Sequence, residues 1–263
     1  MATPHVERMR RGPVDTVTIR RPDVHNTFNE HVIAGLAAAF EEIRGSAETR
    51  VVVLAGEGRS FSAGADLDWM RRAALFTQEE NLRDAEALAA MLRAVAECPC
   101  PVVAKVQGNA FGGGAGLAAA ADVAIAGESA RLAFTEVRLG LVPATIARHV
   151  IRKIGPGRAL PLFLTGGRID AGQAASIGLV HRVVPDAELD DAVSATVDAL
   201  LAGGPEAQRR CKELVRRVAG DDRDLDSYAA ALISQLRASD EGREGVAAFI
   251  ERRDARWIVE RDV

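Results

Sequence analysis

The fold is decided by residues 101–126, which read PVVAKVQGNAFGGGAGLAAAADVAIA. The apolar runs at 101–108 and 123–126 have the composition of β-strands, and the Ala-rich stretch between them has that of a helix. Three glycines at 112–114 separate the first strand from this helix. A strand, a glycine turn, a helix and a second strand in this order are typical of an α/β protein.

The sequence before this stretch continues the alternation. Residues 5–10 and 14–20 predict a β-hairpin, and the run VVVL at 51–54 predicts a strand that is covered on both faces. Capping-box spacings from Thr27 to Glu30 and from Thr77 to Glu80 predict the starts of two helices.

The sequence near the C-terminus changes character. Strand patterns end near residue 186, and helical patterns follow at 188–201, 205–218, 226–237 and 240–253. We therefore expect an α/β core over residues 1–195 and an all-helical region over residues 196–263.

Length, composition and charge restrict the class of protein. A chain of 263 residues suggests one or two ordinary domains. The 48% hydrophobic and 27% charged fractions disfavour long disorder. A formal net charge of −4 argues against a chain-wide grip on nucleic acid. No apolar run reaches the ~20 residues that span a bilayer, so we expect no membrane insertion.

The cysteines and the first residues bear on compartment and metal content. Cys98, Cys100 and Cys211 are odd in number and lack a C-x-x-C pair, which favours neither a disulfide framework nor a zinc site. Residues 1–12 contain basic side chains without the apolar run of a signal peptide behind them. We expect a cytoplasmic protein without a bound metal.

Two glycine-containing turns follow apolar strands and lead into helices: SFSAGAD at 60–66 and NAFGGG at 109–114. Neither contains a P-loop, and Leu117 stands where the dinucleotide fingerprint needs its third glycine. Bare backbone at a helix N-terminus can instead bind an oxyanion. Each turn alone is more typical of simple chain reversal, and the pair leaves both interpretations open. Asp66 is best explained as the N-cap of a helix that begins at Leu67.

Glu136 is the candidate acid/base. A glutamate between a short apolar run and a helix is usually solvated, so its position alone does not indicate catalysis. Its apolar neighbours Phe134, Val137 and Leu139 would disfavour the charged carboxylate. Such an environment suits a group that gives and takes protons near neutral pH.

Three stretches, in this order, resemble the crotonase, or enoyl-CoA hydratase/isomerase, superfamily: FSAGADLDWM at 61–70, the residues at 109–126, and FTEVRLGLVPA at 134–144. The resemblance continues at 164–185 and 241–257 and thus spans nearly the whole chain. It implies a crotonase-like spiral of ββα units, with a C-terminal helical region that helps to build homotrimers, often paired into homohexamers. It also implies an acyl-CoA thioester substrate and no cofactor, since coenzyme A is part of the substrate.

The resemblance also implies roles for individual residues. The backbone N–H groups of Ala65 and Gly113 would hold the thioester oxygen, and Glu136 would be the catalytic acid/base. The residues expected to contact the substrate or its CoA moiety are Ala63, Asp66, Leu67 and Gly112. Hydratases of the family have a second glutamate where this chain has Gly116, and a glycine cannot accept a proton from water.

A closer resemblance is to bacterial hydratases of branched, carboxylated enoyl-CoAs such as methylglutaconyl-CoA. That subgroup shares the FSAGADLxWM pattern, a non-acidic residue at the Gly116 position, and a sequence like PATI at 143–146 in place of a glycine-rich one. We therefore expect syn hydration of an enoyl-CoA. Two alternatives stay open: a 3-to-2 enoyl-CoA isomerase that uses Glu136 alone, and an inert paralogue that binds CoA esters or RNA.

Overall fold

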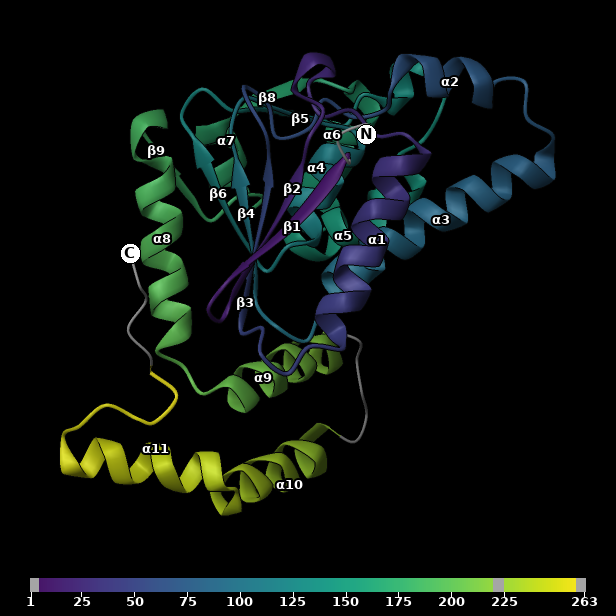
Figure 1. The fold of residues 1–263 in the computed structure, drawn as a ribbon. Helices are drawn as coiled ribbons and strands as arrows, with labels where there is room; N and C mark the ends of the chain where they lie inside the picture. Colours follow the sequence, from purple (N-terminus) through teal and green to yellow (C-terminus); the bar gives the residue numbers. More distant parts are fainter. Residues whose placement is uncertain (1–4, 220–224, 259–263) are drawn as a thin grey trace.

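A six-stranded sheet forms the centre of the computed structural model, which describes residues 5–219 and 225–258 (Figure 1). The first two strands form the predicted antiparallel hairpin, and every later strand is parallel to its neighbour. In spatial order the strands are β1 (Val6–Arg11), β2 (Val14–Ile19), β3 (Val51–Gly56), β4 (Val102–Val106), β6 (Val123–Gly127) and β9 (Arg182–Val184).

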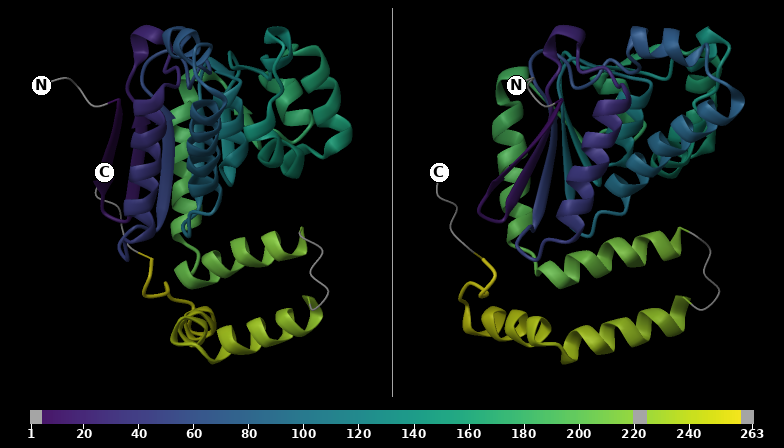
Figure 2. Two further views of the ribbon diagram at one scale, coloured as in Figure 1. Left: turned by 90° about the vertical axis from the view of Figure 1, so that its right-hand side faces the viewer. Right: turned by 45° about the vertical axis from the view of Figure 1, so that its right-hand side comes forward.

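Helices cover both faces of this sheet (Figures 1 and 2). Successive side chains of a strand point to opposite faces, so β3 places Val52 and Leu54 in the larger apolar cluster and Val51 in the smaller one. The larger cluster includes α1 (Glu30–Arg44) and α3 (Gln78–Ala96). The smaller one includes α8 (Leu189–Leu201). The strand at 51–54 is therefore covered on both faces, as predicted.

One of the two predicted capping boxes is present. The Thr77 hydroxyl accepts a hydrogen bond from the Glu80 N–H at 3.2 Å, and the Glu80 carboxylate accepts one from the Thr77 N–H at 2.8 Å. The prediction at Thr27 is wrong, because α1 begins one residue after Asn29, whose side chain accepts from the Val32 N–H. The intervening Phe28 pairs with another extended segment, which keeps the chain from entering the helix earlier.

A second, three-stranded sheet carries the glycine turn. Its strand β5 (Asn109–Phe111) runs parallel to β7 (Arg131–Ala133), which pairs antiparallel with β8 (Arg168–Asp170). The glycines after β5 lead directly into α4 (Gly113–Ala120), as predicted. The remaining elements before α8 are η1 (Pro22–Val24), α2 (Leu67–Ala73), η2 (Glu136–Leu139), α5 (Ala144–Ile154), α6 (Pro156–Thr165), α7 (Ala171–Ser176) and η3 (Asp186–Glu188).

The C-terminal region is helical, as predicted, with α9 (Pro205–Val218), α10 (Leu225–Ala238) and α11 (Asp240–Glu251). The last two lie on the far side of α9 from the sheet (Figure 2). The helix α8 runs through residue 195 and packs on the sheet, so the chain does not change its structure at that position. The division into two regions there stays a prediction. Residues 259–263 of the predicted region lie outside the described residues. Within the described part of the chain, no helix is long and apolar enough to cross a membrane.

Polar contacts join this region to the core. The Arg50 guanidinium, which follows α1 and precedes β3, donates to the Leu201 and Gly203 carbonyls at 2.8 and 2.7 Å. Within the C-terminal region, the Glu241 carboxylate of α11 accepts from the N–H groups of Glu206 and Ala207 at the start of α9, at 2.8 and 2.7 Å. A carboxylate at a helix N-terminus is favourable because it complements the helix dipole.

The α11 helix leaves large apolar side chains in solvent, and this generates our first prediction. Val246, Phe249 and Ile250 are 59, 85 and 72% exposed, and exposing one such side chain forgoes roughly 2 kcal/mol of burial. We predict that this face is buried against another copy in a homotrimer or homohexamer. Light scattering should give three or six times the 27.9 kDa chain mass.

The double substitution Phe249→Asp and Ile250→Asp should lower this mass. Met9→Asp, which places one such charge at another exposed apolar position, on β1, is the control and should leave the mass unchanged. A wild-type chain that stays monomeric at micromolar concentration would contradict the prediction.

Candidate active site

Three short extended segments end at the same edge and bring the predicted site together. Because β5 and β7 are parallel, the residues after Phe111 and after Ala133 leave from the same edge. The segment around Ser62 joins the other side of β5: the Ser62 N–H donates to the Asn109 carbonyl, and the Phe111 N–H donates to the Ser62 carbonyl, both at 3.0 Å. The turn at 109–114, the turn at 60–66 and Glu136 therefore lie next to one another.

The backbone around Ala65 leaves one N–H group available. The N–H of Phe28 donates to the Gly64 carbonyl at 2.7 Å, and the N–H of Asp66 donates to the Phe28 carbonyl at 2.8 Å. These two bonds flank Ala65, whose own N–H has no hydrogen-bond partner among the described residues. Ala65 is exposed, so this N–H is free to bind a ligand.

Gly113 offers a second such group. It is the first residue of α4, where an N–H has no partner within the helix, and the described residues supply none from elsewhere. The preceding Gly112 has φ 49°, a conformation that favours glycine, and its N–H donates to the Ala133 carbonyl at 2.8 Å. The helix dipole adds partial positive charge at this end.

The Glu136 carboxyl group lies against this turn. It belongs to the first residue of η2, three residues after β7, and a Cβ atom on Gly112 would lie 3.4 Å from Glu136 Oε1. Its Oε2 is buried and has no hydrogen-bond partner among the described residues. Burial raises the pKa of the carboxyl, because it disfavours the charged form. The group is thus suited to exchanging protons near neutral pH.

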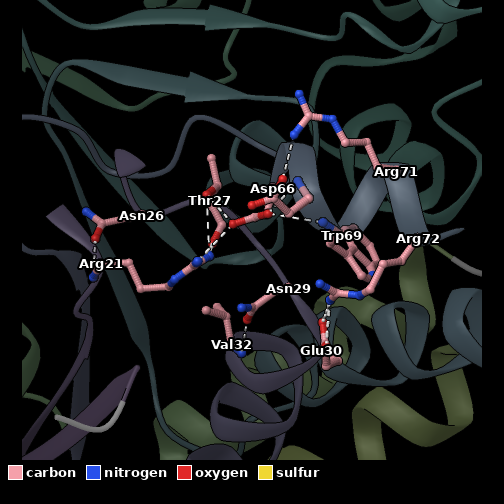
Figure 3. A network of polar contacts seen from close by, with 11 residues as sticks. Arg21, Asn26, Thr27, Asn29, Glu30, Val32, Asp66, Trp69, Arg71 and Arg72 are labelled. Atoms are coloured by element: carbon pink, nitrogen blue, oxygen red, sulfur yellow. Dashed lines mark hydrogen bonds and ion pairs between the residues drawn. The ribbon is translucent and has the colours of Figure 1, made fainter. Parts of the chain in front are cut away.

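Asp66 holds the turn in place, as the N-cap that the sequence predicts. Its Oδ1 accepts from the N–H groups of Asp68 and Trp69 at 2.8 and 3.1 Å, and its Oδ2 accepts from Arg21 at 2.8 Å (Figure 3). Burial opposes ionisation, but these bonds together lower the pKa of Asp66. Its carboxylate is engaged within the protein, so a direct contact with substrate stays a prediction.

Sequence reasoning missed Arg21, which joins the turn at Asp66 to the segment before α1. Besides Asp66, its guanidinium donates to the Thr27 carbonyl at 2.8 Å, one residue before the Phe28 bridge (Figure 3). Arg21 lies 45 positions before Asp66, and nothing in the local pattern connects the two residues. Only the fold brings them together.

The other predicted contact residues lie around the same turn. Ala63 is half-buried, and its N–H donates to the His25 carbonyl at 2.9 Å. This N–H is therefore not available to a ligand, which could contact only the exposed part of the residue. Leu67 is 69% exposed at the start of α2, next to Ala65. This apolar side chain is in a position to contact an acyl or pantetheine chain, and that role stays a prediction.

Gly116 is enclosed, which sharpens its departure from the two-glutamate pattern. A Cβ atom there would lie 2.2 Å from Cγ2 of Ile146, far inside van der Waals contact. Ile146 therefore leaves no room for a side chain at position 116.

The arrangement combines two free N–H groups with one protonatable carboxyl. This set can stabilise an oxyanion while a proton moves to or from the neighbouring carbon. Among residues 5–219 and 225–258, His, Cys, Asp and Glu side chains do not gather in threes as a metal site would need. That the reaction uses no metal or added cofactor stays a prediction.

Comparisons with known proteins agree on one family. Residues 10–260 match the family model described as enoyl-CoA hydratase/isomerase. Enoyl-CoA hydratase AKT6-1 of Alternaria alternata is 31% identical over 248 residues, which are 92% of this chain and 80% of that protein. The structure of an enoyl-CoA hydratase from Shewanella pealeana is 35% identical with a TM-score of 0.92 over 96% of each chain. Pseudomonas aeruginosa AtuE is 32% identical with a TM-score of 0.93 over 97% of this chain and 100% of that one.

The free N–H of Gly113 generates the second prediction. Gly113→Pro removes this donor at a helix position that tolerates proline, and loss of one oxyanion donor costs about 10²–10³ in kcat. Gly113→Ala is the matched control, since both variants place a Cβ about 3.0 Å from the Phe28 ring but alanine keeps the N–H. Equal activity of the two variants in steady-state kinetics would contradict the assignment.

The raised pKa of Glu136 generates the third prediction. An unfolded glutamate ionises near pH 4.5, before the buried one does, so wild-type stability falls as pH rises through the folded-state pKa. Glu136→Gln should therefore gain stability relative to wild type between pH 4 and pH 7.5 in thermal unfolding.

Glu244→Gln is the control of opposite sign. Hydrogen bonds from Arg253 and Arg256 lower the pKa of Glu244 to about 2, so wild type gains stability from this ionisation at higher pH. This variant should lose stability relative to wild type as the pH rises from about 2 to 4.5, and the difference should stay constant at higher pH. A pH-independent effect of Glu136→Gln would show that its carboxyl group is not perturbed.

Proposed function

We propose, from the premise that the chain belongs to the enoyl-CoA hydratase/isomerase family, that it adds water syn across the double bond of an α,β-unsaturated acyl-CoA thioester. One observation carries the proposal. Oε2 of Glu136 is buried and has no hydrogen-bond partner among the described residues, and this carboxyl group lies beside Gly112, one residue before the free N–H of Gly113. The turn that carries the free N–H of Ala65 packs against the same stretch, because a Cβ on Gly64 would lie 3.8 Å from the Gly112 nitrogen. Names of relatives that are enoyl-CoA hydratases also support it.

The two N–H groups would bind the thioester oxygen. As the oxygen of water bonds to Cβ, the electron pair of the C=C bond shifts toward the thioester carbonyl. The thioester oxygen then carries the negative charge of an enolate. Ala65 and Gly113 stabilise the developing negative charge, and each such donor is worth about 2.7–4 kcal/mol. An N–H donor binds an oxygen more tightly when that oxygen carries more negative charge. The thioester oxygen of the ground state is therefore bound less tightly than the enolate oxygen.

Glu136 would move the proton. Its carboxylate takes a proton from the attacking water and then gives it to Cα, which restores the thioester carbonyl. Because one carboxyl performs both transfers, hydroxyl and hydrogen arrive on the same face. The raised pKa suits this cycle, since a group that must both accept and return a proton works best near the ambient pH.

The substrate is proposed to carry a branched, carboxylated acyl chain of the methylglutaconyl-CoA type. This finer proposal rests on the FSAGADLDWM stretch at 61–70, the non-acidic Gly116 and the sequence PATI at 143–146. The exposed apolar side chains of Leu67, Leu141 and Val142, at 69, 57 and 72%, are suited to cover an aliphatic chain.

Isomerisation of a 3-enoyl-CoA to the 2-enoyl-CoA is the second candidate function. The contact between Gly116 and Ile146 favours it, because moving a double bond needs a proton shuttle but no water. The same Glu136 would take a proton from Cα and return it to Cγ, with the same oxyanion donors stabilising the dienolate.

Isotope labelling separates these functions, and it is the fourth prediction. Incubation of 2-enoyl-CoA substrates, methylglutaconyl-CoA included, in ¹⁸O-water should place label in a 3-hydroxyacyl product. Glu136→Gln should slow this by about 10²–10⁴, the usual value of positioned acid–base catalysis.

The alternatives give other results. Conversion of 3-enoyl-CoA without ¹⁸O incorporation from any 2-enoyl-CoA would identify an isomerase. Failure of both reactions, with CoA esters still bound in calorimetry, would identify an inert binding paralogue.

A further inference from the structure

Glu136 and Ile146 each lie against a glycine at the N-terminal end of α4. Gly112 caps this helix and Gly116 follows one turn later, with its N–H donating to the Gly112 carbonyl at 3.0 Å. A Cβ on the first glycine would meet Glu136, and a Cβ on the second would meet Ile146. The carboxyl group therefore lies at the N-cap of α4, and the aliphatic side chain lies against its first turn.

The contact at Ile146 leaves no room for a side chain at position 116. A Cβ on Gly116 would lie 2.2 Å from Cγ2 and 2.6 Å from Cβ of Ile146, and Cβ atoms do not approach within 3.0 Å. Ile146 is 1% exposed in the first turn of α5, and Gly116 is buried as well. Packed interiors do not yield to such overlap without moving a whole element, here α5.

We propose that Ile146 is a specificity-determining residue: its side chain fills the space beside Gly116 where a second carboxyl group would stand, and so leaves Glu136 as the sole acid/base. This inference rests on the proposed function of Glu136. An aliphatic group neither orients water nor accepts its proton, so with Ile146 in place Glu136 alone must activate the water and return the proton. Exchanging the pair at 116 and 146 for glutamate and glycine should add a group that positions the water, and so speed hydration relative to proton exchange at Cα.

The steric part of the proposal is tested by stability alone. Gly116→Ala should lower the melting temperature strongly in the wild-type chain, because the new methyl overlaps Ile146. The same change should have a much smaller effect in an Ile146→Gly background, which removes both contacting atoms. Ile154→Gly, at another buried position of α5, is the matched control and should not lessen the effect of Gly116→Ala. Equal effects in all three backgrounds would overturn the proposal.

The chemical part is tested by a ratio of two reactions. Hydration is measured by ¹⁸O incorporation into the 3-hydroxyacyl product. Enolate formation is measured by exchange of the Cα hydrogen of a saturated acyl-CoA in D₂O, which Glu136 performs without adding water. Adding Gly116→Glu to the Ile146→Gly variant should raise the ratio of hydration to exchange by roughly tenfold or more.

Two results would count against the proposals, and they differ. An unchanged ratio in a folded, exchange-competent Gly116→Glu, Ile146→Gly variant would overturn the role of Ile146 and leave Glu136 intact. Undiminished Cα exchange in Glu136→Gln would overturn the proposed function itself. Should the glutamate variant not fold, the stability measurements on Gly116→Ala still decide the steric claim.

Discussion

Parallel pairing of very short extended segments is the constraint on which the site depends. The strand β5 has three residues, as does β7, and the segments at Phe28 and Ser62 contribute single bridges. In parallel pairing all segments end at the same edge, so whatever follows them is brought together. The free N–H of Ala65 after the Ser62 segment, that of Gly113 after β5 and the carboxyl of Glu136 after β7 are thereby brought together.

Contacts at the start of α2 and at the end of α4 hold the segments of this edge in place. At the first turn, the Arg21–Asp66 pair ties the start of α2 to the segment before α1. At the far end of α4, the Lys153 ammonium donates to the Ala121 carbonyl at 2.6 Å and lies 3.4 Å from two earlier carbonyls. Burial lowers the pKa of Lys153 to about 8, yet the ammonium satisfies the carbonyls and complements the dipole of α4.

Small side chains let α4 lie in the middle of the core. The residues from Gly114 to Ala120 are all buried, and most are glycine or alanine. Their size allows Ser62 to approach the helix closely at Gly114 and Ile146 to approach it at Gly116. The same close packing that surrounds the N–H of Gly113 also excludes a side chain at position 116.

Local sequence patterns were enough to predict the secondary-structure elements and the chemical groups of the site. Alternating apolar runs predicted the strands, the cap at Asp66 predicted the start of α2, and the family resemblance pointed to Ala65, Gly113 and Glu136, since these signals depend on residues close in the chain. Tertiary structure alone decided that Arg21 reaches Asp66, that Thr27 caps no helix, and that Ile146 fills the space beside Gly116. Each of these depends on contacts between segments 30 or more residues apart or on separate elements, and no local periodicity encodes how such surfaces meet.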